Sequence, residues 1–206
     1  MSKGEAVLLD CWANPFCLRA KIALAEKGVE YEARAENLFG GKSDLLLKSN
    51  PINKKVPVFL HDGKPLLGLR HHFSHPVLMR ELRQGSGQIL LTRRSDYDSQ
   101  VFDAVCNIWK TKGNVPGTAK NEFIEILKQL EGALGEKDFF GGDSFGFVDV
   151  IAIPLTCWFY AVEKFGEFKV ENECPKFSAW MNKCMQRETV ARIFPDPEKV
   201  TNLLSR

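Results

Sequence analysis

Three histidines in one short stretch, His71, His72 and His75, are the first residues whose type and spacing suggest chemistry. Two imidazoles four residues apart can share one face of a helix and bind a metal ion such as zinc. However, the stretch has no helix start of its own, and no cysteine or carboxylate follows before Glu81. We therefore expect no metal site here, and we interpret the stretch as a solvated, partly disordered connector.

The cysteines are the other candidates for reactive chemistry, and they are scattered along the chain without a CxxC pair. They are Cys11, Cys17, Cys106, Cys157, Cys174 and Cys184. The chain begins without the apolar run of a signal peptide. Reduced thiols and a cytosolic location are therefore expected.

Composition and charge exclude several classes of protein. Hydrophobic residues make up 44% of the 206 residues and charged residues 26%, which is typical of a globular protein and not of a disordered one. A net charge of +2 creates no field that would attract nucleic acid or an anionic membrane. No stretch approaches the length of apolar sequence that a membrane-spanning helix needs. We expect a soluble protein with neither nucleic acid nor membrane as partner.

The first third of the chain has the pattern of a parallel βαβ unit. Residues 6–10 form a short apolar run that suits a buried strand, and residues 16–27 have apolar positions at helical spacing. Pro15 suits the first position of this helix and Gly28 suits its end. Residues 29–34 then alternate as a half-buried strand should.

A hairpin should follow this unit. Residues 42–49 can form a short helix that ends at Asn50-Pro51. Residues 56–60 form an apolar strand, and the turn Asp62-Gly63 separates it from a second short run. Asp-Gly between two apolar runs is a strong hairpin signal.

The second half of the chain is expected to be all helical. Residues 122–134 place their apolar side chains on one face. Residues 146–165 also follow helical spacing and are apolar nearly all round from 148 to 160, which indicates a central buried helix. Pro154 inside that helix predicts a kink or a local break. Pro175 can open a further helix. By contrast, no clean period runs through residues 68–100, which are rich in arginine.

The start of the central helix has its own signature. Asp149 stands three residues after Gly146, so its carboxylate can reach back to an unpaired N–H there, with Phe145 and Val150 placed as a hydrophobic staple. The alternative is a simple surface turn. We interpret the pattern as a folding signal and not as a catalytic one.

Four segments of the chain are similar to segments of the tau class of plant glutathione transferases. They are residues 8–16 running into 22–28, residues 50–58, residues 140–149 and residues 174–176, in the order and spacing of that family. The resemblance implies an α/β thioredoxin-like N-terminal domain followed by an all-α C-terminal domain, the architecture of cytosolic glutathione transferases. It implies a glutathione-binding domain at 1–83, a linker at 84–95 and a helical domain with a hydrophobic-substrate cleft at 96–206.

The resemblance also implies a chemistry. Such enzymes are homodimers that join reduced glutathione, as co-substrate and with no further cofactor, to small hydrophobic electrophiles in detoxification. A hydrogen bond at the N-terminus of the first helix, together with the helix dipole, favours the glutathione thiolate. The family's catalytic serine aligns with Asn14, whose amide can also donate to a thiolate. The alternative for Asn14 is a helix N-cap without any other role.

Glutathione-binding positions follow from the same resemblance. Val56-Pro57 stands where the family has a cis-proline, and a cis bond would turn the backbone of Val56 toward the cysteinyl group of glutathione. Lys42 and Lys55 align with positions that contact the glycine carboxylate. The alternative for either lysine is a solvated surface residue.

Aromatic residues are implied to contact the hydrophobic substrate. These are Phe16, Phe102, Trp109 and Trp158, of which Trp109 is the preferred contact. The alternative is that they belong to the core, as isolated aromatic residues on helices usually do.

The chain departs from the family pattern between residues 68 and 100. The Glu-Ser pair that holds the γ-glutamyl carboxylate is replaced by Gly68-Leu69, and the family's third helix is not recognisable in this block. The sharp boundaries of the block favour an altered reading frame, an unusual splice or a gene-model error. Loss of one charge-assisted hydrogen bond would weaken glutathione binding by about tenfold to a hundredfold, so the activity is expected to be impaired.

Two alternative functions remain open. One is a non-catalytic binder of hydrophobic ligands with the same fold. The other is a glutathione-dependent reductase acting through Cys17, which occupies the second-cysteine position of a glutaredoxin-like CPxC run. A buried core residue is the preferred interpretation of Cys17.

Overall fold

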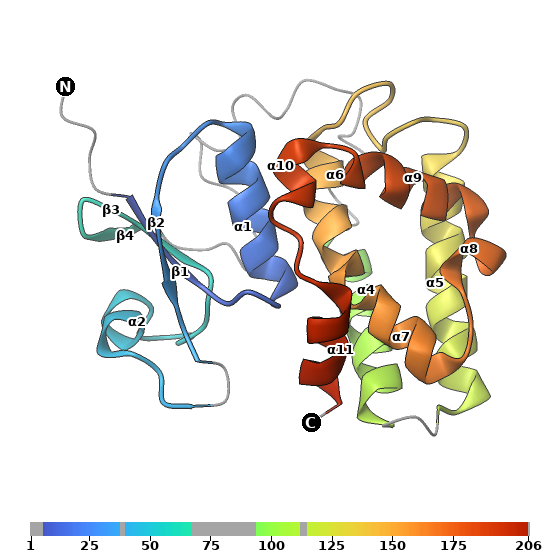
Figure 1. Ribbon diagram of the computed structural model, residues 1–206, viewed down its shortest axis with the longest axis horizontal. Helices are drawn as coiled ribbons and strands as arrows, with labels where there is room; N and C mark the ends of the chain where they lie inside the picture. The colour runs from blue at the N-terminus through green and yellow to red at the C-terminus, as the bar shows by residue number, and fades with distance from the viewer. Residues whose placement is uncertain (1–5, 38–39, 67–93, 112–114, 206) are drawn as a thin grey trace. The chain divides into compact units, whose positions relative to one another are not determined.

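The computed structural model describes residues 6–37, 40–66, 94–111 and 115–205 (Figure 1). The chain divides into two compact units, residues 1–81 and residues 82–206, and each is described by itself. His71, His72, His75 and Gly68-Leu69 lie outside the described residues, as does nearly all of the predicted linker at 84–95. The domain boundaries therefore stay a prediction.

The described residues of the first unit form a four-stranded mixed sheet and two helices. Its elements are β1 (Ala6–Asp10), α1 (Pro15–Glu26), β2 (Glu32–Ala35), α2 (Asp44–Ser49), β3 (Val58–His61) and β4 (Lys64–Leu66). The strand order is β2-β1-β3-β4, with β1 parallel to β2 and antiparallel to β3, and β3 antiparallel to β4. The predicted βαβ unit and hairpin are confirmed. Asp62 and Gly63 both have positive φ, as a tight hairpin turn requires.

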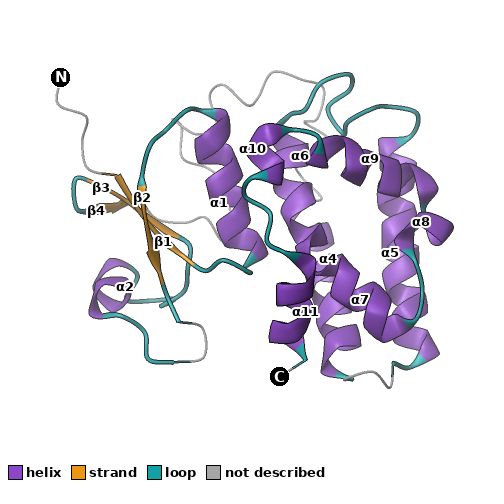
Figure 2. Cartoon of the chain, viewed as in Figure 1, coloured by secondary structure: helices purple, strands orange, loops and turns teal. Residues whose placement is uncertain are grey.

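β1 is the centre of the first unit because both of its faces are buried. Leu8 packs with Ala20 and Leu24 of α1, while Val7 and Leu9 belong to a cluster that includes Leu46 of α2, Val58 and Leu60. The two helices therefore cover opposite faces of the sheet (Figure 2). This explains why the strand is a continuous apolar run and does not alternate.

The prediction of a half-buried strand at residues 29–34 was wrong in two respects. β2 begins at Glu32, and all four of its residues are exposed. The delay has a local cause, because Gly28 has a φ of 61° and the backbone N–H of Val29 bonds to Leu24, so these residues still belong to the end of α1. The exposure follows from the position of β2 at the edge of the sheet, beside β1 alone.

The second unit is all helical, as predicted. Its elements are α4 (Arg94–Lys110), α5 (Gly117–Leu134), α6 (Phe147–Ala152), the 3-10 helix η1 (Ile153–Trp158), α7 (Phe159–Gly166), α8 (Val170–Glu173), α9 (Pro175–Met185), α10 (Glu188–Ala191) and α11 (Pro197–Leu204). The core contains edge-to-face aromatic pairs, including Phe123 with Phe159 and Phe140 with Trp180. None of the helices in the described ranges is long and apolar enough to cross a membrane.

Pro154 breaks the central helix of this unit as predicted. The chain leaves α-helical geometry at Ile153, runs as a 3-10 helix to Trp158 and resumes as α7. Proline lacks the backbone N–H that an α-helix would use at this point. α9 likewise begins at Pro175.

Two helix starts lie earlier than the sequence indicated. α5 begins at Gly117, five residues before the predicted start, and α4 begins at Arg94, within the block that predicted no element. The residues at both starts are polar and carry no apolar period. The helical pattern of α4 becomes readable only from Val101, where Val101, Ala104 and Ile108 are buried on one face.

Asp149 holds the start of α6 and connects it to a distant helix. Its Oδ2 accepts from the backbone N–H of Gly146 at 2.9 Å, and its Oδ1 accepts from Phe140 at 3.0 Å and from the indole N–H of Trp180 at 2.8 Å. The side chain is completely buried, so the alternative of a surface turn was wrong. Burial raises the pKa of Asp149, and the hydrogen bonds oppose that shift.

Replacing Asp149 with alanine should strongly destabilise the helical unit, because two buried donors and one partly buried donor would lose their acceptor at once. We expect the free energy of unfolding to fall by about 3 kcal/mol or more. Urea denaturation followed by circular dichroism measures it. Asp143→Ala, at an exposed position six residues earlier, is the control and should change stability by less than about 0.5 kcal/mol. Equal losses in both variants would contradict the role given to Asp149.

Candidate active site

Asn14 is the N-cap of α1 and has three of its hydrogen-bonding groups fixed there. Its Oδ1 accepts from the backbone N–H of Phe16 at 2.9 Å and of Cys17 at 3.2 Å. Its own N–H donates to Cys11 and its carbonyl accepts from Leu18. The side-chain Nδ2 makes no hydrogen bond within the part of the chain that the structure describes. Asn14 can therefore cap the helix with its oxygen and still donate from its nitrogen.

The environment of Asn14 favours an anion. The first turn of α1 contains no acidic residue, so the positive end of its helix dipole is not neutralised there. Backbone N–H groups at such a helix start attract anions, and a thiolate is one. The half-buried Phe16 follows in the first turn, with the guanidinium of Arg19 5.1 Å from the centre of its ring.

The loop that carries Lys55 and Val56 is held in place by Asn50. The buried Asn50 side chain donates from Nδ2 to the carbonyl of Lys55 at 3.0 Å and accepts at Oδ1 from the N–H of Asn53 at 3.2 Å. The peptide bond between Val56 and Pro57 is cis, which confirms the prediction, and both residues are buried. Sequence reasoning treated Asn50 only as a helix stop. The missed signal was an asparagine just ahead of a turn, where its amide can bond to nearby backbone.

Both lysines of the predicted glutathione site are exposed. Lys42 precedes Ser43, the N-cap of α2, and Lys55 precedes the cis-proline pair. Ser43 in turn donates to the carboxylate of Glu36, which fixes the start of the helix. Neither lysine has an ion-pair partner among the residues of the four described ranges. Each is therefore available to an anionic ligand, and the alternative of a solvated surface residue remains open.

The structure brings together two of the predicted aromatic contacts in the helical unit. The rings of Phe102 on α4 and Trp158 on η1 lie 5.5 Å apart at 44°, and both are half-buried. Trp109 lies two turns beyond Phe102 on α4, and its indole N–H donates to the carbonyl of Leu204 at the end of α11. The three residues offer a partly exposed aromatic surface.

Cys17 is a core residue, as the sequence analysis preferred. It is fully buried, and its Sγ accepts from the backbone N–H of Cys11 at 3.3 Å. Burial raises its pKa strongly, and the nearby charge of Asp10 adds to that shift. Thiolates and not thiols are nucleophilic, so this arrangement disfavours the reductase that acts through Cys17. All six cysteines are buried, and none forms a disulfide.

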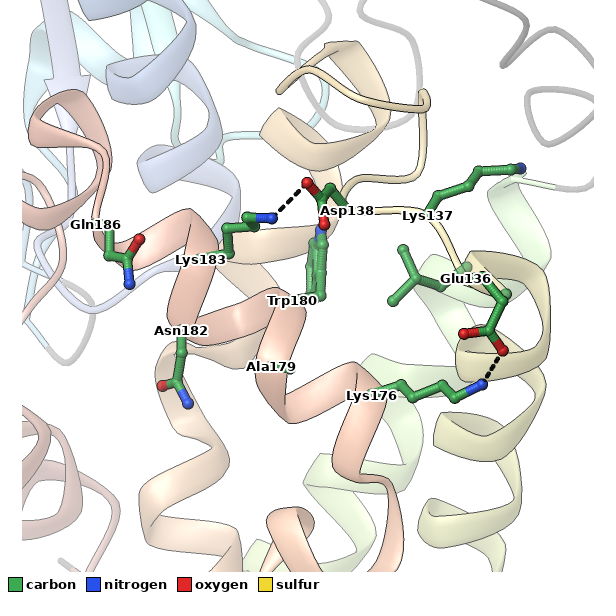
Figure 3. Close-up of a pocket in the computed structure, with 11 residues that line it drawn as sticks. Glu136, Lys137, Asp138, Lys176, Ala179, Trp180, Asn182, Lys183 and Gln186 are labelled. Carbon is green, nitrogen blue, oxygen red and sulfur yellow. Dashed lines mark hydrogen bonds and ion pairs between the residues drawn. The ribbon is translucent and has the colours of Figure 1, made fainter.

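A separate groove lies on the helical unit, but it contains none of the predicted site residues. It has a volume of about 460 Å³ and lies between the loop after α5 and the helix α9, beside Trp180. Figure 3 shows Lys176 and Lys183 of α9 reaching to Glu136 and Asp138 of the loop. Each lysine is neutralised by a carboxylate of the loop, and the two ion pairs connect the loop to the helix. Among the described residues no three histidine, cysteine or acidic side chains gather as metal ligands.

Comparison with known proteins places this arrangement in a family. Residues 5–67 match the family described as glutathione S-transferase, N-terminal domain, and residues 101–188 match glutathione S-transferase, C-terminal domain. The chain belongs to the glutathione S-transferase family.

Its similarity is to the tau class of plants, as the resemblance implied. The chain is 44% identical to glutathione S-transferase U19 of Arabidopsis thaliana, over 98% of this chain and 95% of that one. It is 45% identical to the probable glutathione S-transferase parC of Nicotiana tabacum, over 97% of this chain and 94% of that one. The solved structure of rice GST1 (OsGSTU1) in complex with glutathione matches with a TM-score of 0.82 and 38% identity, over 99% and 96%. The solved structure of the tau-class enzyme of mango matches with a TM-score of 0.81 and 28% identity, over 97% of this chain and 96% of that one.

The burial of Cys17 leads to a direct prediction about thiol chemistry. In the native protein Cys17 should not react with iodoacetamide near neutral pH, because its thiol is fully buried and its pKa is raised. Peptide mass spectrometry of native and of denatured, alkylated protein measures this. The denatured sample is the control and should carry the label at Cys17. Rapid native labelling of Cys17 would contradict the core assignment and reopen the reductase hypothesis.

Proposed function

We propose that the protein is a glutathione transferase that joins reduced glutathione to small hydrophobic electrophiles. The observation that carries this proposal is Asn14, which caps α1 with Oδ1 and keeps Nδ2 as a donor at the positive end of the helix. Family membership supports it, as does the bound glutathione named for the rice relative. By the same family argument we propose a cytosolic homodimer that acts in detoxification, with the domain boundaries given above.

The reaction needs a thiolate. The thiol of glutathione loses its proton to solvent, the sulfur attacks an electrophilic carbon, and a new C–S bond forms. The displaced group leaves with its bonding electron pair, or an activated double bond accepts the pair and then a proton. An anion at a helix N-terminus is stabilised by roughly 0.3–1 kcal/mol. A hydrogen bond from Asn14 Nδ2 to a charged sulfur would contribute about 1.5–3 kcal/mol more.

Glutathione itself is proposed to bind along the loop before β3. The cationic groups of Lys42 and Lys55 suit its glycine carboxylate, and the backbone of Val56, beside the cis Pro57, suits pairing with its cysteinyl group. The γ-glutamyl end has no serine at Gly68-Leu69 to hold it. We therefore expect an affinity about tenfold to a hundredfold weaker than a complete site would give.

The electrophile is proposed to be apolar and aromatic in character. Phe102 and Trp158 form a paired aromatic surface, and Trp109, fixed by its bond to α11, extends the aromatic face of α4. Aromatic side chains of this kind bind flat apolar groups through area burial and ring stacking. Phe16 on α1 is a further proposed contact for the electrophile.

Glutathione should stabilise the native protein, since any ligand that binds only the folded state must raise its stability. With reduced glutathione present at 100 times its dissociation constant, the free energy of unfolding should rise by about 2.7 kcal/mol. Thermal unfolding measures this, and a chromogenic conjugation assay tests turnover on the same sample.

The two measurements separate the possible functions. Glutathione protection together with turnover above the glutathione-only background supports the transferase. Uptake of a hydrophobic ligand without protection by glutathione would overturn it in favour of the non-catalytic binder.

Asn14 variants should separate helix capping from catalysis. Asn14→Asp keeps an acceptor for Phe16 and Cys17 but has no N–H₂ donor, and it places a negative charge beside the thiolate. We expect its kcat/KM to fall by about a hundredfold while stability is kept, comparable to the loss of one oxyanion donor. Asn14→Ala should lose activity and also about 1 kcal/mol of stability. Asn14→Ser should keep activity within about tenfold. Full activity of Asn14→Asp would show that Asn14 is an N-cap alone.

A further inference from the structure

A partly buried ion pair lies directly ahead of the loop that ends at Asn14. Asp10 is the last residue of β1, and its Oδ2 accepts from Nζ of Lys21 on α1 at 2.8 Å. The Asp10 side chain is 8% exposed and the Lys21 side chain 19%. The pair thus connects the end of the central strand to the second turn of the helix whose N-terminus Asn14 caps.

The second oxygen of Asp10 is poorly compensated, although the Cys17 thiol interacts with the Asp10 side chain. Its Oδ1 is buried and has no hydrogen-bond partner among the residues that the structure describes. Buried carboxylates usually have every oxygen satisfied, because desolvating a charge without partners is costly. Lys21 is therefore the main counter-charge of this carboxylate, and the balance between the two decides the local field.

Other charged groups around Asp10 are either engaged elsewhere or lie farther along their elements. On α1, Arg19 stacks on Phe16. On β2, Arg34 pairs with Glu32, and Glu36, directly after β2, accepts from Ser43. On α2, Asp44 and Lys48 are exposed. β3 contributes apolar residues beside this end of β1, since His61 pairs with Ala6 at the opposite end.

The charges of the pair also act on the two thiols nearest to Asn14 in the sequence. Cys11 and Cys17 lie on either side of Asn14 in the sequence, and burial is the main cause of the raised pKa of each. The charge of Asp10 raises both pKa values further, and the charge of Lys21 lowers that of Cys11. A glutathione sulfur held at Asn14 would enter the same field.

We propose that the Asp10–Lys21 ion pair sets the electrostatic field at the N-terminus of α1 and thereby controls how readily the thiol of bound glutathione ionises. The two residues are positioning residues and touch neither substrate. This inference rests on the proposed function, because it requires glutathione to bind with its sulfur near Asn14. The two charges act in opposite directions, and their near cancellation leaves Asn14 and the helix dipole to favour the thiolate.

The opposite signs supply the test. Asp10→Asn leaves Lys21 unbalanced and should lower the pKa of bound glutathione, whereas Lys21→Gln leaves Asp10 unbalanced and should raise it. We expect each shift to be about half a pH unit or more. In the double variant the pKa of bound glutathione should return close to its value in the unmodified protein. Ultraviolet absorbance of the thiolate in the saturated glutathione complex, titrated against pH, measures the shift, and the acidic limb of kcat/KM should move with it.

Controls separate this effect from a loss of structure. Lys21→Arg keeps the positive charge and should leave the pKa of bound glutathione unchanged. Lys48→Gln removes an exposed lysine and should also leave that pKa unchanged. If Asp10→Asn does not fold, the contrast between Lys21→Gln and Lys21→Arg still decides the matter. A purely structural role would misplace Asn14 in both single variants and raise the pKa in both.

The inference would be overturned if Asp10→Asn and Lys21→Gln both bind glutathione but shift its pKa in the same direction or not at all. That result would not contradict the proposed transferase function. A lack of glutathione binding by the unmodified protein would overturn both, and thermal protection by glutathione detects that case separately.

Discussion

The unsatisfied N–H groups at the start of α1 are the constraint on which the candidate site depends. A helix begins with backbone donors that have no partner inside the helix. Asn14 supplies an acceptor for two of them, and doing so fixes the plane of its amide. The oxygen must face the helix, so the nitrogen is directed away from it. The same donors and the helix dipole make this end of α1 attractive to an anion. One local requirement of folding thus orients the donor that catalysis is proposed to use.

A second asparagine applies the same physics to the loop before β3, where glutathione is proposed to bind. Asn50 donates to the carbonyl of Lys55 and accepts from Asn53, so a loop without regular structure becomes fixed. That loop delivers Lys55 and Val56 to one end of the sheet. In both places a short amide side chain replaces backbone partners that a turn cannot supply. The two side chains differ in the atoms that they use. Asn50 bonds through both its amide nitrogen and its amide oxygen, whereas Asn14 bonds to the described residues through its amide oxygen alone.

The sequence predicted what depends on local pattern and missed what depends on distant partners. β1, α1, the Asp62-Gly63 hairpin, the break at Pro154 and the cap by Asp149 follow from spacing and from the chemistry of proline, glycine and aspartate. The exposure of β2 could not be predicted, because its place at the sheet edge is a property of the whole sheet. The bond from Asp149 to Trp180 spans 31 residues, and that from Asp10 to Lys21 spans 11. Nothing in the spacing of either pair marks it. The roles of Lys42, Lys55 and the aromatic residues stay predictions, since each depends on a ligand.

The replacement of a serine by Asn14 is compatible with thiolate chemistry for a geometric reason. A serine hydroxyl has one oxygen, so capping the helix and donating to sulfur draw on the same atom. Asparagine divides these tasks between two atoms, and the cap holds the donor in a fixed direction. The amide places its nitrogen farther from the backbone than a hydroxyl oxygen would lie, which moves the preferred sulfur position outward from the helix. Catalysis then depends on whether the rest of the glutathione site accommodates that displacement. The γ-glutamyl end is the part of the ligand with the greatest freedom to do so, because this chain has Gly68-Leu69 where the family resemblance implies a serine that holds it.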